Sequence, residues 1–330
     1  MSGGVDSGVA AYLLHREGYD CRGVTFDMNG GEDGNGAKAI CDALGFPHET
    51  EDAAADFAKF VRDPFAEEYK NGRTPNPCVV CNKNVKFPRL IQAADRNGCE
   101  YAATGHYARV AKIGDSHYIR KGADTFKDQS YMLWALTEDI VSRMVFPLGD
   151  FTKADIREIA REAALPCHSS PDSQDICFIP DGDLRGYLDR SLGSAESGDF
   201  VDAAGNILGH HIGQRNFTIG QSRGLGIALG KKMYVLSKDA RENRVVLGDE
   251  CDLYKTEVKA SGIRLSESLE RETRLSVKLR YTRHESIAAV WRSGEDEITA
   301  RFDEPVRAPA PGQSMVLYDG DCVIGGGIIL

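Results

Sequence analysis

A glycine-rich loop that leads directly into a helix constrains this chain more than any other feature. Residues 2–7 read SGGVDS, and residues 7–17 have the apolar spacing of a helix that ends at Gly18. Glycines let a backbone approach an anion closely, and the amides at the start of a helix point toward it. Asp6 disfavours a bare phosphate, so we expect it to hold Mg²⁺ or to orient the loop. The alternative is a polar turn that only caps the helix.

The order of the expected elements indicates three domains. Short apolar runs alternate with helical segments over residues 1–180, which predicts an α/β domain with a doubly wound parallel sheet. Short glycine-separated strands predict a small, mostly-β central domain over residues 181–254, and alternating runs predict a C-terminal β-barrel over residues 255–330, with a sandwich as the alternative. In the first domain we expect strands at residues 21–26 and 101–104, and helices at residues 37–44, 53–69 with an interruption at Pro64, 87–96, and 152–164 capped by Thr152.

The position of the glycine loop also leaves a gap in the expected sheet. In a doubly wound fold the phosphate-binding loop follows a strand, but this sequence has no residue before Met1. The first strand is therefore missing from the sequence. We expect the natural chain to begin roughly ten residues earlier, because an open central position leaves backbone groups unpaired.

Composition excludes some classes of function. The formal net charge is −10, which argues against an indiscriminate nucleic-acid binder. A local basic patch can still bind RNA, since charges act over about 8–10 Å at moderate salt. No apolar run approaches the roughly 18 residues of a membrane span, and the polar start is not a signal peptide. We therefore expect a cytoplasmic protein without a membrane partner.

The cysteines indicate thiol chemistry. The nine cysteines are scattered through the chain, which favours thiols over a disulfide scaffold. Cys78 and Cys81 form a Cys-x-x-Cys pair, and the prolines before them predict a stiff loop rather than a helix. We expect Lys83 and Lys86 to lower the pKa of the nearby thiols and so favour the thiolate. A zinc or redox site is the alternative, although no second Cys-x-x-Cys pair is present.

Several sequence blocks, taken in order, resemble one known family. They read MSGGVDS, GRTPNPCVVCNKNVKF, ATGHYAR, KDQSYML, SQDICFI, TIGQSRGLGI and PGQSMVLYDGDCVIGGGII. The first block is similar to the loop of the PP-loop ATP pyrophosphatases, which cleave ATP to AMP and pyrophosphate. Together the blocks resemble the tRNA-specific 2-thiouridylases within that group. The resemblance implies an enzyme that adenylates C2 of the wobble uridine of tRNA and transfers persulfide sulfur to it, giving 2-thiouridine.

The same resemblance implies roles for individual residues. Cys177 would carry the persulfide, and Cys81 would be the nucleophile that completes the transfer. A covalent carrier splits one difficult step into two. The implied ATP site, with Mg²⁺, comprises Ser2, Gly3, Gly4, Val5, Asp6, Ser7, Phe26 and Gly105. The implied tRNA contacts are Asn76, Pro77, Cys78, His106, Lys127, Asp128, Gln129, Arg280, Tyr281 and Gln313, and further phosphate contacts could come from Arg215, Arg223, Lys231 and Lys232. The implied partners are the tRNAs for Lys, Glu and Gln, and a cysteine desulfurase or relay protein that donates the persulfide.

Three alternatives remain open. Cys78, Cys81 and Cys177 could hold a [4Fe–4S] cluster with one open iron, because three thiolates leave the fourth position free. An amide-forming ligase would use the same ATP loop but needs neither paired cysteines nor an RNA-binding barrel. A binding module with a decayed ATP site is disfavoured by the intact loop and both cysteines.

Overall fold

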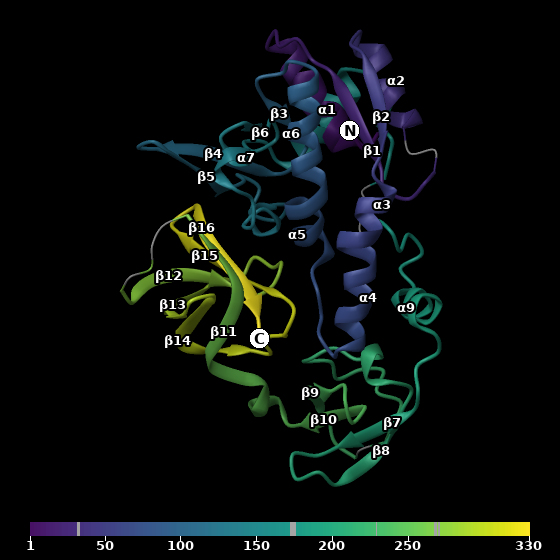
Figure 1. The fold of residues 1–330 in the computed structure, drawn as a ribbon, viewed down its shortest axis with the longest axis vertical. Coiled ribbons are helices and arrows are strands. Elements are labelled where there is room, and N and C mark those ends of the chain that lie inside the picture. The colour runs from purple at the N-terminus through teal and green to yellow at the C-terminus, as the bar shows by residue number, and fades with distance from the viewer. Residues whose placement is uncertain (32–33, 172–175, 229, 267–268, 270) are drawn as a thin grey trace. The chain divides into compact units, whose positions relative to one another are not determined.

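The chain folds into two compact units. The computed structural model describes residues 1–31, 34–171, 176–228, 230–266, 269 and 271–330 (Figure 1). The first unit comprises residues 1–62, 78–178 and 318–324, and the second comprises residues 63–77, 179–317 and 325–330. Among the described residues, no helix has the length and apolar character needed to cross a bilayer.

The first unit is an α/β domain built around parallel strand pairs. Its elements are α1 (Val5–Arg16), β1 (Gly23–Asp27), α2 (Asn35–Leu44), β2 (His48–Asp52), α3 (Ala54–Phe57), the π-helical segments η1 (Ala58–Arg62) and η2 (Asn82–Lys86), α6 (Phe87–Arg96), β3 (Ala102–Ala103), β4 (Ala108–Ile113), β5 (Ser116–Lys121), the 3₁₀ turn η3 (Ser130–Met132), α7 (Glu138–Val141), β6 (Met144–Val145) and α8 (Lys153–Glu162). Strand β1 pairs with β2 and β3 pairs with β6, both in parallel, while β4 and β5 form an antiparallel hairpin. The described strands do not join β1 to β3.

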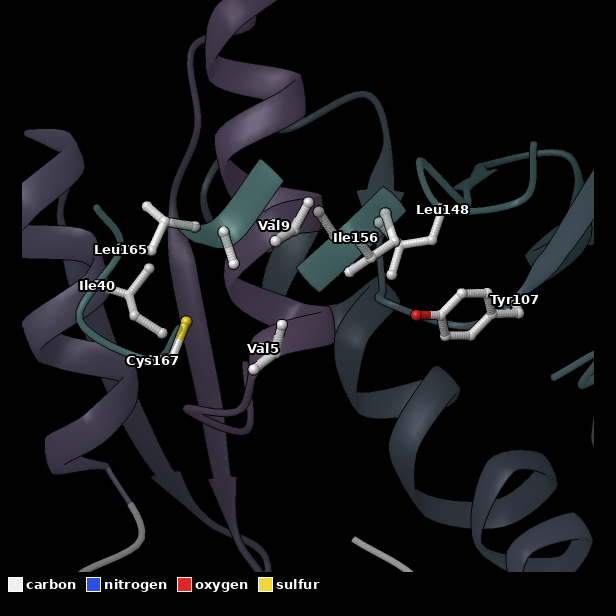
Figure 2. Close-up of a cluster of buried hydrophobic side chains, with 10 residues drawn as sticks. Val5, Val9, Ile40, Tyr107, Leu148, Ile156, Leu165 and Cys167 are labelled. Carbon is white, nitrogen blue, oxygen red and sulfur yellow. The ribbon is translucent and has the colours of Figure 1, made fainter. Parts of the chain in front are cut away.

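The core of this unit is packed around α1. Figure 2 shows Val5 and Val9 of α1 with Ile40, Leu165 and Cys167 on one side and Leu148, Ile156 and Tyr107 on the other; these side chains form one buried cluster. Helix α8 begins as predicted, since Thr152 accepts a hydrogen bond from Asp155 N and Asp155 accepts one from Thr152 N. Burial of α1 fixes the glycine loop from which that helix starts.

Two expectations about prolines need correction. The segment at residues 76–83 is not a loop, because α5 (Pro77–Cys81) begins at a proline. Proline is well suited to the first turn of a helix, where its missing N–H has no partner to lose. The interruption expected at Pro64 lies before it, as the π-helical segment η1. Segment η2 likewise lies before Pro88, and a π turn in each case accommodates the hydrogen bond that a proline cannot donate.

The second unit is mostly β, as predicted. Its elements are α4 (Asp63–Lys70), α9 (Leu184–Leu192), β7 (Gly198–Val201), β8 (Ile207–His211), η4 (Gln214–Asn216), β9 (Tyr234–Asp239), β10 (Arg244–Gly248), η5 (Glu250–Leu253), β11 (Tyr254–Leu265), β12 (Thr273–Lys278), β13 (Ser286–Gly294), β14 (Glu297–Arg307), β15 (Ser314–Asp319) and β16 (Cys322–Ile329). Strands β7 to β10 form a small sheet in the order β8-β7-β10-β9 around a core that includes Phe200 and Val235.

The C-terminal strands close into a barrel rather than a sandwich. Their order is β11-β14-β13-β12-β15-β16, and β16 pairs back onto β11 (Figure 1). Closure brings the two backbones very close at Gly325, which has φ of +142°. A Cβ at Gly325 would lie 2.1 Å from Arg264 O and 2.8 Å from Leu265 Cα. Only glycine therefore fits at this pair of strands.

The barrel closure predicts a large cost for Gly325→Ala. We expect it to lower the free energy of unfolding by about 3 kcal/mol, because the new methyl overlaps β11 and the residue keeps a strained φ. Gly320→Ala is the control: its φ is +55° but its Cβ would meet nothing within 4 Å, so we expect a loss of about 1 kcal/mol. Urea unfolding followed through Trp291 fluorescence, in a Trp134→Phe background, measures the barrel. Equal losses in the two variants would contradict the close approach.

Candidate active site

Glycines hold the loop at residues 2–7 against its neighbours. Gly3 has φ of +77°, and a Cβ there would lie 3.0 Å from Ala37 N in the first turn of α2. A Cβ on Gly105, just after β3, would lie 2.7 Å from Asp6 C and 2.9 Å from Ser7 N. Neither position accepts a side chain without movement of the loop. The loop therefore lies at the carboxyl edge of β3, where ligands bind in parallel sheets.

The start of α1 is arranged to receive an anion. Gly4 is the N-cap, and no side chain of the described residues caps the first amides of α1. Ser7 Oγ donates to Gly4 O at 3.1 Å and lies 3.2 Å from Ser2 Oγ, so the two hydroxyls brace the loop from within. Uncapped amides at a helix start favour a negatively charged ligand.

Asp6 is held by two groups that the sequence did not reveal. Tyr107 Oη donates to Asp6 Oδ1 at 2.7 Å, and Lys153 Nζ lies 2.6 Å from the same oxygen. Tyr107 follows Gly105 in the ATGHYAR block, and Lys153 is the first residue of α8. The predicted cap at Thr152 gave the correct start of α8. The sequence does not show, however, that Lys153 lies next to Asp6, because the two residues are far apart in the chain. Tertiary packing makes this contact.

The proposed sulfur-transfer cysteines lie close together in the first unit. Cys81, at the end of α5, is buried in a cluster with Phe57 and Val61, and Phe26 and Phe178 pack against that cluster. The rings of Phe57 and Phe178 meet edge to face at 5.6 Å, which anchors the residue that follows Cys177. Residues 172–175, including Asp175 of the SQDICFI block, lie outside the described residues. All nine cysteines are free thiols.

Burial, not the neighbouring lysines, dominates the ionisation of these thiols. Desolvation raises the pKa of Cys81 to about 11; Lys86 has the next largest effect and lowers it, and the Cys177 thiol raises it. Desolvation also raises the pKa of Cys177 and of Cys78, although both side chains reach the surface. The expectation that lysines would lower these pKa values below the usual range is therefore wrong. Lys86 does lower the pKa of these thiols, as expected, but by less than desolvation raises it. Lys83 is exposed to solvent.

His106 is a neutral imidazole between aromatic rings. Its ring lies 5.6 Å from Phe87 and 6.2 Å from Phe146, and its Nδ1 lies 2.8 Å from Thr104 Oγ1. Burial, with a contribution from Lys86, lowers the pKa of His106 to about 3. His106 can therefore exchange a hydrogen bond with a ligand but carries no charge near neutral pH.

The segment at residues 127–129 is braced by its own polar groups. Asp128 is buried; its Oδ1 accepts from Gly122 N and its Oδ2 from Ser130 Oγ, at 3.1 and 3.0 Å. Gln129 Oε1 accepts from Tyr107 N at 2.9 Å, which joins this turn to the residue that holds Asp6. Asp128 and Gln129 thus support the turn, and their contact with tRNA stays a prediction.

The remaining predicted tRNA residues belong to the second unit. Gln313 Nε2 donates to Thr74 O at 2.7 Å, Arg280 Nη2 donates to Ala308 O, and Tyr281 is exposed. Asn76 is half-buried and Pro77 is buried at the start of α5.

Four further cations were suggested as phosphate contacts, and two of them form ion pairs within the protein. Arg215 is buried, with Nη2 at 2.5 Å from Asp189 Oδ1, and Lys231 Nζ lies 2.7 Å from Asp249 Oδ1. Lys232 Nζ lies 4.9 Å from the centre of the Tyr234 ring, and Arg223 is exposed. Of the four, Arg223 and Lys232 are the better candidates for phosphate contacts.

The described residues contain no group of three or more His, Cys, Asp or Glu side chains placed to hold a metal ion. Cys78, Cys81 and Cys177 are among the described residues. They lie near one another, but they are not placed to hold a metal ion together.

The raised thiol pKa values predict a steep pH dependence of alkylation. Between pH 7 and pH 10 the thiolate fraction of Cys81 rises about tenfold per pH unit, because its pKa is about 11. We expect exposed Cys177 and Cys251 to react first with iodoacetamide and Cys81 to react slowly, with a rate that climbs through this range. Peptide mass spectrometry of timed samples measures each site. A Cys81 rate that levels off below pH 9 would contradict the dominance of burial.

Comparison with known proteins assigns the whole chain. Residues 1–181 match the family described as tRNA methyl transferase HUP domain, residues 185–249 the tRNA methyl transferase PRC-barrel domain, and residues 255–329 the aminomethyltransferase beta-barrel domain. The chain is 43% identical over 350 residues to the tRNA-specific 2-thiouridylase MnmA of Clostridioides difficile (strain 630), covering 100% of this chain and 96% of that protein. It is 42% identical over 351 residues to the protein of the same name from Treponema denticola, with the same coverage.

A solved structure described as U34-tRNA thiolase NcsA from Methanococcus maripaludis with its [4Fe-4S] cluster covers 58% of this chain and is itself covered to 64%, at 16% identity and a TM-score of 0.36. That score is too low to support an argument about fold or mechanism. The matches along the full length of the chain are decisive: this protein belongs to the family of the tRNA-specific 2-thiouridylases.

Proposed function

We propose that this protein is an ATP-dependent sulfurtransferase that converts a tRNA uridine to 2-thiouridine. One observation carries the proposal: an uncapped helix start behind the SGGVDS loop and a group of three neighbouring thiols belong to the same compact unit. The helix start suits the phosphates of ATP. The thiols suit sulfur transfer, which an amide-forming ligase does not perform. Membership of the 2-thiouridylase family supports this combination.

The reaction proceeds by activation and then transfer. The uracil C2 oxygen attacks the α-phosphorus of ATP, pyrophosphate leaves, and C2 now carries AMP as a leaving group. The terminal sulfur of a Cys177 persulfide attacks C2 and expels AMP. Cys81 attacks Cys177 Sγ, the S–S bond to the transferred sulfur breaks, and 2-thiouridine leaves as a Cys81–Cys177 disulfide forms. An external thiol reductant restores the two cysteines, and a persulfide donor such as a cysteine desulfurase or relay protein reloads Cys177.

The position of Cys81 suits the last step of this sequence. A thiol with a pKa of about 11 is mostly protonated at neutral pH, so it is a poor nucleophile before substrate binds. Lys86 is the nearby cation whose charge favours ionisation of all three thiols. Delayed ionisation of Cys81 protects the Cys177 persulfide from premature attack.

Asp6 can accommodate the Mg²⁺ expected with ATP. Its Oδ1 is held by Tyr107 and Lys153, and the described part of the chain supplies no hydrogen bond to its Oδ2. Mg²⁺ typically binds one or two carboxylates together with phosphate oxygens and waters. When bound, the ion would neutralise charge on the phosphates, and Asp6 would be its protein ligand.

The persulfide route fits this arrangement better than a [4Fe–4S] cluster. The cluster alternative needs Cys78, Cys81 and Cys177 to converge on one iron–sulfur unit. Within the described residues they do not form such a group, and Cys81 is packed among apolar side chains. Sulfur transfer between two cysteines requires only that they meet in pairs.

Substitution of the two cysteines should separate activation from transfer. We expect Cys81→Ser and Cys177→Ser to abolish 2-thiouridine while tRNA-dependent pyrophosphate release persists, because the thiols act after adenylation. Iron-free enzyme is incubated with ATP, Mg²⁺, a persulfide donor and tRNA; nucleoside mass spectrometry and a pyrophosphate assay report the two steps. Cys251→Ser, at an exposed thiol in the second unit, is the matched control. Thiolation by either variant would refute its assigned role, and activity only after anaerobic iron–sulfur reconstitution would establish the cluster.

Contacts with tRNA are tested through salt dependence. We expect Lys127→Ala and Arg280→Ala each to weaken tRNA binding and to reduce the slope of log K against log salt by about 1, as for one lost phosphate contact. ATP affinity should stay the same. Lys112→Ala, at an exposed lysine on β4, controls for net charge. Because Arg280 also hydrogen-bonds Ala308 O, the melting temperature of that variant is measured beside its affinity. Unchanged slopes in both variants would contradict the assignment.

A further inference from the structure

Asp27 is a carboxylate at the end of a parallel strand to which the sulfur-transfer scheme gives no role. It is the last residue of β1, and its register partner on β2 is Asp52. Its backbone O accepts from Ala53 N at 2.8 Å, so the end of the strand is firmly held. Parallel sheets bind ligands at the carboxyl ends of their strands. Asp27 therefore lies on the edge of the sheet at which a ligand is expected.

Two contacts of Met1 place β1 next to the loop at residues 2–7. The amino group of Met1 donates to Val24 O, and Thr25 Oγ1 donates to Met1 O at 2.8 Å. Side chains two residues apart on a strand project from the same face, so Asp27 shares a face of β1 with Thr25. It lies roughly 7 Å farther along the strand, toward the carboxyl edge. The loop and the carboxylate of Asp27 therefore border the same end of β1.

The two oxygens of the Asp27 carboxylate have different surroundings. Oδ1 accepts from the backbone N of Asn29, Gly30 and Gly31, at 3.1, 2.7 and 3.2 Å. These hydrogen bonds, led by the one from Gly31, lower the pKa of Asp27, so the group is ionised near neutral pH. In the part of the chain that the structure describes, no group donates to Oδ2. One oxygen shapes the turn after β1, and the other is a charged acceptor suited to a hydroxyl donor.

The spacing along the chain indicates which hydroxyl this acceptor meets. Asp27 follows Ser7, the last residue of the loop, by 20 residues, and α1 lies between the loop and β1. In doubly wound folds that bind dinucleotides, phosphates lie at the start of the helix after a glycine loop. An acidic residue about 20 residues farther on accepts a hydrogen bond from the ribose 2′-hydroxyl. The SGGVDS loop has a different sequence from that glycine motif, but the order of loop, helix, strand and acidic residue is the same.

We propose that Asp27 Oδ2 accepts a hydrogen bond from a ribose hydroxyl of ATP and thereby makes the site selective for a ribonucleotide over a deoxynucleotide. A site built to bond a hydroxyl rejects an analogue that lacks it, because the polar group of the protein is then left without its donor. Asp27 binds the nucleotide and takes no part in bond making or breaking. This inference rests on the proposed function, because it assumes that the loop at residues 2–7 binds ATP.

Nucleotide binding to the purified full-length protein tests the inference, in isothermal titration calorimetry with Mg²⁺ and without tRNA. We expect the wild-type protein to prefer ATP about tenfold over 2′-deoxy-ATP or over 3′-deoxy-ATP, the loss typical of one hydrogen bond to a charged group. Asp27→Asn should weaken ATP binding by about the same factor but hardly weaken binding of that deoxynucleotide. The asparagine keeps one oxygen for the amides of residues 29–31. Asp52→Asn, which removes the same charge at the same register of β2, is the control and should leave all affinities unchanged.

Comparison of the nucleotides separates a ribose contact from the other roles open to Asp27. If Asp27→Asn weakens ATP and both deoxynucleotides equally, Asp27 only shapes the turn or holds Mg²⁺, and the inference is overturned. A loss that persists with both deoxynucleotides but vanishes with inosine triphosphate would assign the contact to the adenine amino group and overturn it too. Equal affinity of the wild-type protein for ATP and both deoxynucleotides overturns it whether or not the variants fold. Failure of the wild-type protein to bind any of these nucleotides overturns the proposed function as well.

Discussion

The close approach of Gly105 to the backbone of Asp6 and Ser7 is the constraint on which the rest of the first unit depends. A Cβ added at Gly105 would lie less than 3 Å from that backbone, so the loop packs directly against the segment that follows β3. Val5 and Val9 then bury α1 immediately behind the loop. The amides of α1 are therefore presented by a packed core rather than by a mobile turn. Rigid presentation lowers the entropic cost of ordering the loop around a nucleotide.

The thiols illustrate a conflict between burial and charge. Lys86 favours ionisation of Cys78, Cys81 and Cys177, but desolvation is larger at each of them. The Cys-x-x-Cys motif with its lysines correctly predicts that nearby positive charge lowers the thiol pKa. It does not reveal the apolar cluster of Phe57, Phe26 and Phe178 that buries Cys81. For a persulfide carrier, this balance is useful, because a protonated thiol cannot attack its neighbour before the substrate is activated.

Local signals in the sequence predicted much of the fold. The helices expected at residues 87–96 and 152–164 match α6 and α8 almost to the residue, and the alternating runs over residues 255–330 correspond to barrel strands. The expectation that proline would keep the segment with Cys81 out of a helix was wrong. Proline disrupts the interior of a helix, but Pro77 lies in the first turn of α5, where proline is tolerated. The C-terminal barrel was predicted and is confirmed, but the strand pair that closes it could not be predicted, since β11 and β16 are distant in sequence and meet at a glycine whose position only the register reveals.

The residues missed at the site share one physical character: each acts through a contact between distant parts of the chain. Asp124 is the clearest case. Its Oδ1 accepts from Phe126 N and its Oδ2 from Lys153 N. The turn before Lys127 and the start of α8 therefore share one carboxylate, and α8 in turn supplies the ammonium on Asp6. Within the first unit, a short chain of hydrogen bonds thus joins the segment at residues 127–129 to the loop at residues 2–7. No motif contains this connection, because it exists only once residues 6, 124 and 153 have been folded together.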